Sequence, residues 1–373
     1  MKKYELTSET KNGLFGQTLY RIKSCINFTT VSGYEVKKGE LGGWVEKEEN
    51  LSQDGTAWIR DNAEVSGNAE IFDNAEIFDD AKIGGRAKIF GNAKVYGSAV
   101  ISFDAKIHEN ALVCGNARVF HDAEVCGNTK ICNHAEICGS AVISGNAKIR
   151  DSAKIFGNVE ICDNAEICGS AEVWDNVKVF GDAIVYGYAI VYGYARVSDN
   201  AKIYGKAEVY GGARVFESAR VYGNSKIFGG AEIFGKAEIF DSAKIYGKAE
   251  VYGNAEIYGS AKIFENAEVC GDAVICGDAV ISKDAHISSS EHLMCVSPIP
   301  VNGHSSSLTL FRSNKGELNI QFNMKDVKTI DEFKAFIDTF VEISDRLALI
   351  TIVELGKRCI DLTTQKINEG ETA

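Results

Sequence analysis

The 373-residue sequence has little proline and no long apolar run. Its two prolines, Pro298 and Pro300, lie close together, and we expect them to mark a structural boundary. No segment approaches the ~20 consecutive apolar residues that a membrane-spanning helix needs, and residues 1–6 lack the apolar stretch of a signal peptide. We therefore expect no membrane association and a cytoplasmic location.

Positive charge is also in short supply. The chain has 40 Lys and Arg residues against 52 Asp and Glu residues, which gives a formal net charge of −12. Because nucleic acids and anionic membranes repel an acidic protein, we expect neither as a partner. A basic protein partner is compatible with this charge.

The 11 cysteines would suggest disulfides in a small secreted protein. Most of them, however, occupy a position that elsewhere holds Tyr or Phe, as Cys114, Cys126, Cys138 and Cys168 do. We therefore expect free cysteines that act as modest apolar residues in a reducing compartment.

A six-residue repeat fills the centre of the chain. From Ala57 to Ala285 it runs through 39 consecutive units of the form Ala-x-Ile/Val-aromatic-Gly-Asn, without insertion or deletion. The third position is always Ile or Val. A six-residue apolar spacing does not stay on one face of a helix with ~3.6 residues per turn, so each unit predicts one short strand and one corner. The first position is Ala except at Thr129, Val159, Val177 and Ser225.

One unit, Ala93–Ser98, illustrates the expected geometry. Residues two apart in a strand point to the same side, so Ala93 and Val95 are expected inside and Lys94 and Tyr96 outside. Gly-Asn and similar pairs then turn the chain. Because alanine is small, three strands can close around a triangular core, which predicts ~13 coils and a length of about 60 Å. This core needs no cofactor.

The repeat divides the chain into three expected parts. These are an N-terminal cap at 1–50, a β-solenoid at 51–290 and a C-terminal α+β domain at 291–373. Caps are expected because the open ends of a solenoid expose unpaired strand edges. In the first part, Thr18–Ile22 is strand-like and Gly39–Glu46 is rich in turn residues.

The C-terminal part contains a hairpin signal and a helix signal. Residues 308–312 and 318–322 alternate as strands do and flank Asn314-Lys315-Gly316. Thr329 and Glu332 then match a capping box that starts a helix. In this helix, Ile330, Phe333, Ile337 and Phe340 are expected to lie on one apolar face.

Units such as Ile71-Phe72-Asp73-Asn74-Ala75-Glu76 resemble the hexapeptide repeat, which has an aliphatic residue at one position and a small residue four later. The resemblance implies a left-handed parallel β-helix, an exception to the usual right-handed crossover. Both ends extend it, because segments 41–46, 308–312 and 329–333 are similar to modules of phage and prophage proteins. Those proteins are labelled YdcK-like, acyltransferase or polymer-forming.

The resemblance also raises an enzymatic alternative. Hexapeptide-repeat acyltransferases form trimers, bind an acyl donor between neighbouring prisms and use a histidine helped by a loop that leaves the coil. No such loop interrupts this repeat. Because equivalent positions stack at every third unit in a coil of three units, His108, His121 and His134 fall on different faces or corners, and we expect no catalytic site within one chain.

Metal binding is tested by the same stacking argument. Cys114 and Cys132 hold the same position in units that lie three apart, and they are expected to stack in adjacent coils. A stacked pair supplies two ligands, whereas a zinc site needs about four, and parallel side chains ~4.8 Å apart are poorly placed for a disulfide. We therefore expect no metal site.

The outward aromatic residues form the stronger surface signal. In the expected coil they line up as two ladders, whose length favours a protein interface or self-association over a purely supporting role. The charged residues before each aliphatic position mix both signs, which suits strand register more than binding of a polyanion. The first ladder is Phe156, Trp174, Tyr192, Tyr210, Phe228, Tyr246 and Phe264, and the second is Tyr186, Tyr204, Tyr222, Phe240 and Tyr258.

The preferred functional hypothesis is a non-enzymatic solenoid of phage or prophage type. It would bind a protein, for example a host defence protein in the host cytoplasm, through its aromatic ladders or its end domains, and would form a dimer or trimer. One alternative is an acyl-CoA-dependent acyltransferase with a site between subunits. The other is a self-assembling structural protein.

Overall fold

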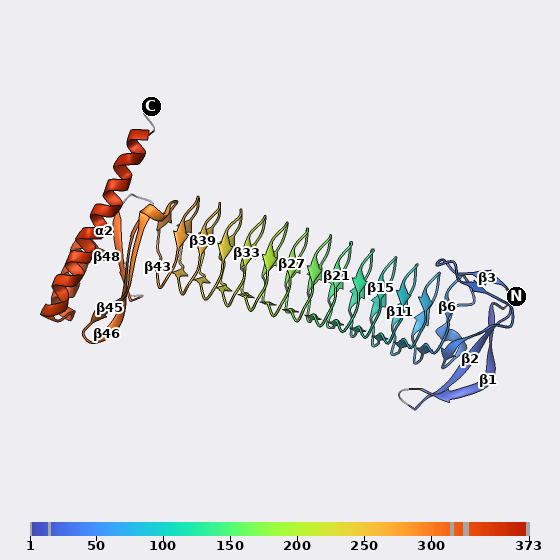
Figure 1. Ribbon diagram of the computed structural model, residues 1–373. Helices are drawn as coiled ribbons and strands as arrows, with labels where there is room; N and C mark the ends of the chain where they lie inside the picture. The colour runs from blue at the N-terminus through green and yellow to red at the C-terminus, as the bar shows by residue number, and fades with distance from the viewer. Residues whose placement is uncertain (1, 14–15, 314–316, 324–327, 371–373) are drawn as a thin grey trace. The chain divides into compact units, whose positions relative to one another are not determined.

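The structure is a computed structural model that describes residues 2–13, 16–313, 317–323 and 328–370. It is a β-solenoid of about 14 turns with three parallel sheets, an N-terminal antiparallel cap, and a C-terminal antiparallel sheet with two helices (Figure 1). The predicted fold class is confirmed. The chain divides into two compact units, Met1–Gly193 and Tyr194–Ala373, which are described separately.

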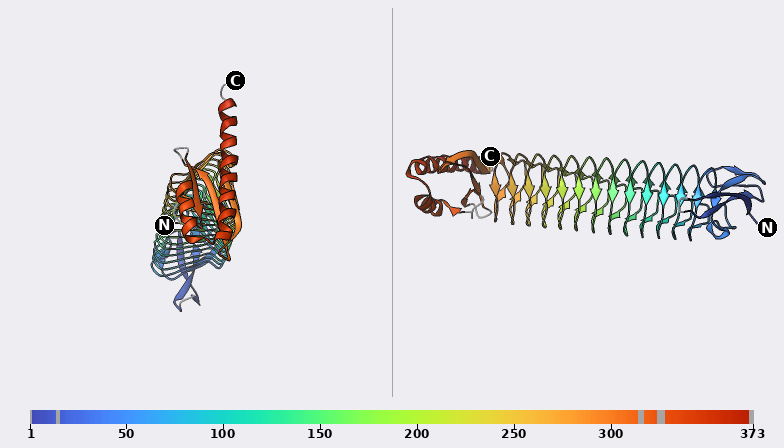
Figure 2. Two further views of the ribbon diagram at one scale, coloured as in Figure 1. Left: turned by 90° about the vertical axis from the view of Figure 1, so that its left-hand side faces the viewer. Right: turned by 90° about the horizontal axis from the view of Figure 1, so that it is seen from below.

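Each hexapeptide contributes one two-residue strand. The first unit contains β6 (Trp58–Ile59) to β28 (Ile190–Val191), and the second contains β29 (Arg196–Val197) to β44 (His286–Ile287). Within each unit a strand pairs in parallel with the strand three further along, as Lys82 does with Val100. A coil therefore holds three hexapeptides, as predicted, and strands of successive coils lie side by side (Figure 2).

Alternation along the strand separates the core from the surface. Ala93 and Val95 are fully buried, whereas Lys94 and Tyr96 remain partly exposed. The same pattern holds for the first and third positions of the units. Because burying one Ile or Val side chain contributes about 1.5–3 kcal/mol before chain entropy is subtracted, the inward column accounts for the fold.

The corners place the fifth residue of the hexapeptide at positive φ. Gly97 has φ 70° and Asp79 has φ 58°, a region that favours glycine and, among other residues, Asp and Asn. The Asp79 carboxylate also accepts a hydrogen bond of 3.0 Å from the N–H of Gly97 in the next coil. Such corner carboxylates join consecutive coils, a feature that was not predicted from the sequence.

Asparagine side chains form a ladder along one corner of the first unit. Asn74 Nδ2 donates to Asn92 Oδ1 at 3.2 Å, and Asn92 Nδ2 donates to Asn110 Oδ1 at 3.1 Å. Each amide both donates and accepts, so the row satisfies itself from coil to coil. The complete row is Thr56, Asn74, Asn92, Asn110, Asn128, Asn146, Asn164 and Asp182.

The N-terminal cap pairs with the first coil. Its β5 is parallel to β7 and antiparallel to β2, so segment 39–46, expected to be turn-rich, contains a strand. Gly42 and Gly43 permit this, because an added Cβ would lie 2.6 Å from Ile22 and 2.5 Å from Ile59, respectively. The cap elements are β1 (Tyr4–Asn12), β2 (Thr18–Ser24), β3 (Phe28–Thr29), β4 (Glu35–Val36), β5 (Leu41–Val45) and the 3-10 helix η1 (Glu48–Asn50), and β7 is Glu64–Val65.

The C-terminal part is an antiparallel sheet covered by two helices. The predicted hairpin is present as β46 paired with β47, while its turn at 314–316 lies outside the described residues. The predicted capping box between Thr329 and Glu332 starts α1. The elements are β45 (Leu293–Val301), β46 (His304–Arg312), β47 (Leu318–Phe322), β48 (Lys328–Thr329), α1 (Ile330–Phe340), α2 (Ile343–Gly370) and the 3-10 helix η2 (Ser290–His292).

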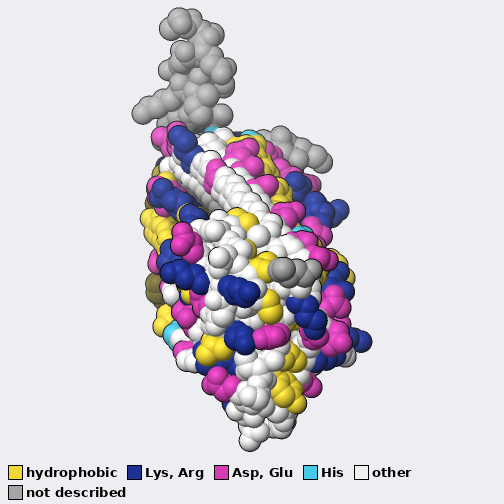
Figure 3. Space-filling view, turned by 90° about the vertical axis from the view of Figure 1, so that its right-hand side faces the viewer, with side chains coloured by type: hydrophobic (Ala, Val, Ile, Leu, Met, Phe, Trp, Pro, Cys, Tyr) yellow, Lys and Arg dark blue, Asp and Glu magenta, His cyan; other side chains and the backbone are white. Residues whose placement is uncertain are grey.

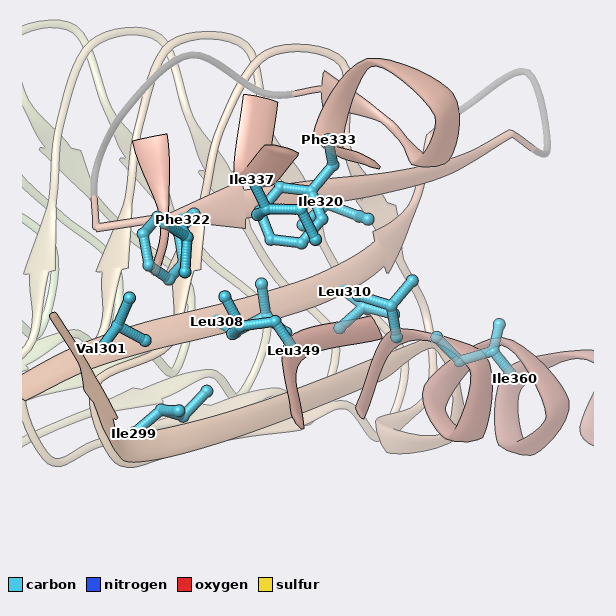
Figure 4. Close-up of a cluster of buried hydrophobic side chains, with 12 residues drawn as sticks. Ile299, Val301, Leu308, Leu310, Ile320, Phe322, Phe333, Ile337, Leu349 and Ile360 are labelled. Atoms are coloured by element: carbon cyan, nitrogen blue, oxygen red, sulfur yellow. The ribbon is translucent and has the colours of Figure 1, made fainter. Parts of the chain in front are cut away.

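A hydrophobic core joins this sheet to the helices. Phe333 and Ile337 of α1 are buried in it, together with Leu308, Leu310 and Leu349 (Figure 4). Phe340, the fourth residue of the predicted apolar face, is exposed.

The other side of the sheet closes the last coil. The N–H of Val280 in β43 (Val280–Ile281) donates to Thr309 Oγ1 at 3.0 Å, and Ser282 Oγ donates to Gln321 Oε1 at 3.1 Å. Thr309 and Gln321 are both buried. The terminal strand edge is therefore satisfied by side chains of β46 and β47, which fulfils the role expected of a cap.

Candidate functional site

The first predicted aromatic ladder is stacked within each unit. In the first unit, Trp174 and Tyr192 have centroids 4.4 Å apart and planes 5° apart. In the second unit, Tyr210, Phe228, Tyr246 and Phe264 follow one another at 4.7–4.9 Å with planes only 2° apart. These separations match the ~4.8 Å spacing of parallel strands, so the rings follow the backbone. Phe156 occupies the same position one coil before Trp174.

The second predicted ladder has the same geometry. Tyr204 and Tyr222 lie 4.7 Å apart, Tyr222 and Phe240 5.0 Å, and Phe240 and Tyr258 4.9 Å. Tyr186, in the first unit, occupies the equivalent fourth position of its hexapeptide. The predicted coil thus aligned the rings correctly within each unit.

A third ladder was missed in the sequence. Phe216 stacks on Phe234 at 4.9 Å, and Phe234 stacks on Tyr252 at 4.8 Å. The signal was available, since these residues also hold the fourth position of every third hexapeptide. All three faces of the second unit therefore carry stacked rings, so stacking alone does not distinguish one face as an interface.

The ladder rings are also partly covered. All 12 predicted residues are half-buried, and burial raises the pKa of the Tyr210 and Tyr246 phenols. Burial, with a hydrogen bond to Glu238, raises the pKa of Tyr222 to about 12. Two tyrosines outside the predicted ladders are more exposed, Tyr188 at 67% and Tyr194 at 70%.

A row of exposed apolar residues lies on the C-terminal helices. Leu349, Val353 and Ile360 of α2 are buried against the sheet, while other apolar residues of the helices face outward. This row was missed in the sequence, although the two apolar faces of α2 could have been read from helical spacing. This helix row consists of Phe340 (64% exposed), Ile343 (81%), Leu347 (72%) and Leu355 (55%).

The histidines of the first unit lie in separate rows, as predicted. His108 stacks on Phe90 at 4.7 Å, and His121 stacks on Phe103 at 4.8 Å. His134 Nε2 lies 3.1 Å from Asn116 Nδ2. Each imidazole thus belongs to a row of its own, and the three do not converge.

The cysteines are free, as expected. Burial raises the pKa of the Cys132 and Cys168 thiols, which is the opposite of what an activated nucleophile needs. Burial, with Glu109 and Glu124 nearby, also raises the pKa of Cys126.

Two mixed clusters were missed in the sequence. Among the described residues, His108 lies with Glu124 and Cys126, and Glu268 lies with Cys270 and His286. The sequence argument compared only residues that hold equivalent positions in successive coils. The residue equivalent to His108 in the next coil is Cys126, but the carboxylate that contacts His108 belongs to Glu124, two residues earlier. A search that also allowed this two-residue offset would have found the first cluster.

No protein-family model matches the chain, and no curated protein matches it. The family resemblance therefore stays a prediction. Among the described residues, no helix has the length and apolar character needed to span a membrane.

Proposed function

We propose that this chain is a non-enzymatic β-solenoid that binds a protein partner, with the helix row as the main contact surface. The proposal includes the phage or prophage origin and the left-handed coil that the resemblance implies, the cytoplasmic location expected from the sequence, and a host protein as the partner. The observation that carries it is the exposure of Phe340, Ile343, Leu347 and Leu355.

The energetics favour covering this row. Burying a large apolar side chain contributes about 1.5–3 kcal/mol, so covering the four side chains would contribute several kcal/mol to an association. The opposite face of α2 already packs on the sheet, which leaves the exposed residues for a partner. Because the helix already packs on the sheet, less conformational entropy is lost on binding.

Charge argues for a protein partner over a polyanion. Ion pairs run between coils, such as Arg214 to Glu232 at 2.7 Å and Lys226 to Glu208 at 2.8 Å. Acidic and basic side chains are also interspersed over the face displayed in Figure 3. Mixed charges of this kind support solubility and register without creating a continuous basic surface.

The caps weigh against polymerisation through strand edges. The sheet β45–β48 covers the last coil, and β5 with its antiparallel partner β2 covers the first. Association through the helix row would instead form a closed dimer or trimer, or a complex with another protein.

A comparison of matched variants tests the proposal. Sedimentation velocity and capture from a lysate of the natural host would be measured for the full chain, for Ile343→Ser with Leu347→Ser, and for the control Lys357→Ser with Arg358→Ser on the same helix. We expect the apolar pair to abolish a discrete complex and the control to retain it.

Two other results would redirect the assignment. Loss of the complex in Tyr192→Ser, Tyr210→Ser and Tyr246→Ser, but not in the helix variant, would move the contact to the predicted ladders. Acyl-CoA binding by calorimetry would contradict the non-enzymatic proposal and support an acyltransferase, while filaments by electron microscopy would support self-assembly.

A further inference from the structure

The first mixed cluster is built by two neighbouring strands. Glu124 belongs to β17 (Glu124–Val125), and Cys126 directly follows it, so both side chains point outward. His108 follows β14 (Lys106–Ile107), which pairs in parallel with β17. The coil therefore brings a nitrogen, an oxygen and a sulfur ligand together on the outer face of the sheet that contains β14 and β17.

The ligand atoms are close enough to share one ion. His108 Nε2 lies 3.0 Å from Glu124 Oε1, and the nitrogen, carboxylate oxygen and sulfur all lie within 4.8 Å of one another. Metal–ligand bonds of about 2.0–2.3 Å place tetrahedral ligands roughly 3.3–3.8 Å apart. Side-chain rotations that move the ligand atoms by about 1 Å would therefore complete the site without moving the backbone.

The imidazole is held in place before any ion binds. Its ring stacks on Phe90 with planes 4° apart, and the His108 side chain is only 15% exposed. Glu124 pairs in register with Lys106, yet its carboxylate meets His108. A preorganised ring reduces the entropy lost when the site closes around a metal.

We propose that His108, Glu124 and Cys126 bind one divalent transition-metal ion of the zinc class, with a fourth coordination position open to water or another ligand. Thiolate and imidazole ligands favour Zn²⁺ and Co²⁺ over Mg²⁺ and Ca²⁺, which prefer oxygen. With an ionised carboxylate and a thiolate, the site neutralises the two positive charges of the ion.

The second cluster shows why the first is the better site. Glu268 already accepts a hydrogen bond from the Tyr252 hydroxyl on Oε1, and its Oε2 lies 3.0 Å from His286 Nδ1. Both carboxylate oxygens are occupied, so an ion at Glu268, Cys270 and His286 would have to displace two bonds. We expect this cluster to bind metal more weakly.

A cobalt titration of the chelator-treated full chain tests the assignment. We expect Co²⁺ to produce a thiolate-to-cobalt charge-transfer band that saturates at one equivalent and is removed by Zn²⁺. Cys126→Ser should remove the band, and His108→Gln should weaken binding at least tenfold. His286→Gln should leave the band unchanged.

The matched control is Cys162→Ser. Glu160 and Cys162 repeat the Glu-x-Cys spacing, but Ser144 stands where His108 would be, and Glu160 pairs with Lys178 at 2.7 Å. This variant should retain the band, and circular dichroism should show every variant folded. Absence of the band in the wild type, its persistence in Cys126→Ser, or its loss in Cys162→Ser or His286→Gln would overturn the proposal.

Discussion

In the first unit the outward fourth position of the hexapeptide holds Ser, Gly, His, Cys, Arg and aromatic residues, whereas in the second unit every such position from Tyr204 to Phe264 is Tyr or Phe. The inward positions are the same small and aliphatic residues in both units. Folding therefore depends on the inward column, and the outward positions are free to differ in chemistry.

The largest expected effect is a test of that shared column. Ile137→Ala in the first unit and Ile239→Ala in the second should each lower the local free energy of unfolding by about 3 kcal/mol, because each leaves a cavity in the core. Hydrogen exchange of the neighbouring strands would measure both. Very different losses in the two units would contradict the view that the column is equivalent.

A second test separates the outward positions. Phe228→Ala removes a ring stacked between Tyr210 at 4.9 Å and Tyr246 at 4.7 Å, so we expect a loss of about 1–2 kcal/mol in local stability. Cys132→Ala, an outward residue of the first unit, should cost about 0.5 kcal/mol or less. Equal losses in hydrogen exchange would show that the ladder does not stabilise the second unit.

The corners provide a third test. Gly235 has φ +69°, and an added Cβ would lie 2.7 Å from the N of Gly253, so Gly235→Ala should lower stability by about 1–2 kcal/mol. Gly277 has φ +64° but nothing within 4 Å of an added Cβ. Gly277→Ala should therefore cost less in thermal unfolding, and the reverse order would show that the close contact is unimportant.

A fourth test uses the asparagine ladder of the first unit. Asn110 bonds to Asn92 and Asn128 at 3.1 Å each, so Asn110→Ala should cost about 1 kcal/mol in local stability. Ser218 occupies the same hexapeptide position in the second unit, and Ser218→Ala should have a smaller effect on hydrogen exchange. Equal effects of the two substitutions would show that the asparagine ladder does not stabilise the first unit.

The smallest expected effect is a pH dependence at the end of the second unit. Burial lowers the pKa of His292, with Arg312 and His286 adding to the effect. Because the unfolded chain then binds the proton more readily, stability is present above pH ~6.5 and is lost as the pH falls. Chemical unfolding at pH 7 and pH 5 should show a larger loss for the wild type than for His292→Gln, and equal losses would refute the linkage.

Most of the fold could be predicted because one physical pattern repeats along the chain. The unbroken spacing determines which residues face inward and which residues stack, as Lys82 and Val100 do. The strand at Leu41–Val45 was missed because Gly42 and Gly43 look like turn residues, and only their close approach to Ile22 and Ile59 explains them.

The candidate sites were predicted less completely. The two ladders followed directly from the coil, but the exposure of Phe340 was not predicted, because helical spacing alone does not say how much of an apolar face is covered. The His108 cluster depends on which side chains turn toward one another between neighbouring coils. The direction in which these side chains turn depends on their rotamers and on neighbouring charges, and a comparison of equivalent positions in successive coils does not take these into account.

A coil of three hexapeptides also limits how this chain can change in length. Duplication of one whole coil would keep every surface row aligned. Insertion of a single hexapeptide between His108 and Glu124 would preserve the apolar interior but rotate everything downstream onto the next face, parting the imidazole from its carboxylate and thiol. The fold alone would thus tolerate insertion of one hexapeptide at a time. A chain that must also keep a functional site on its surface could lengthen only by whole coils.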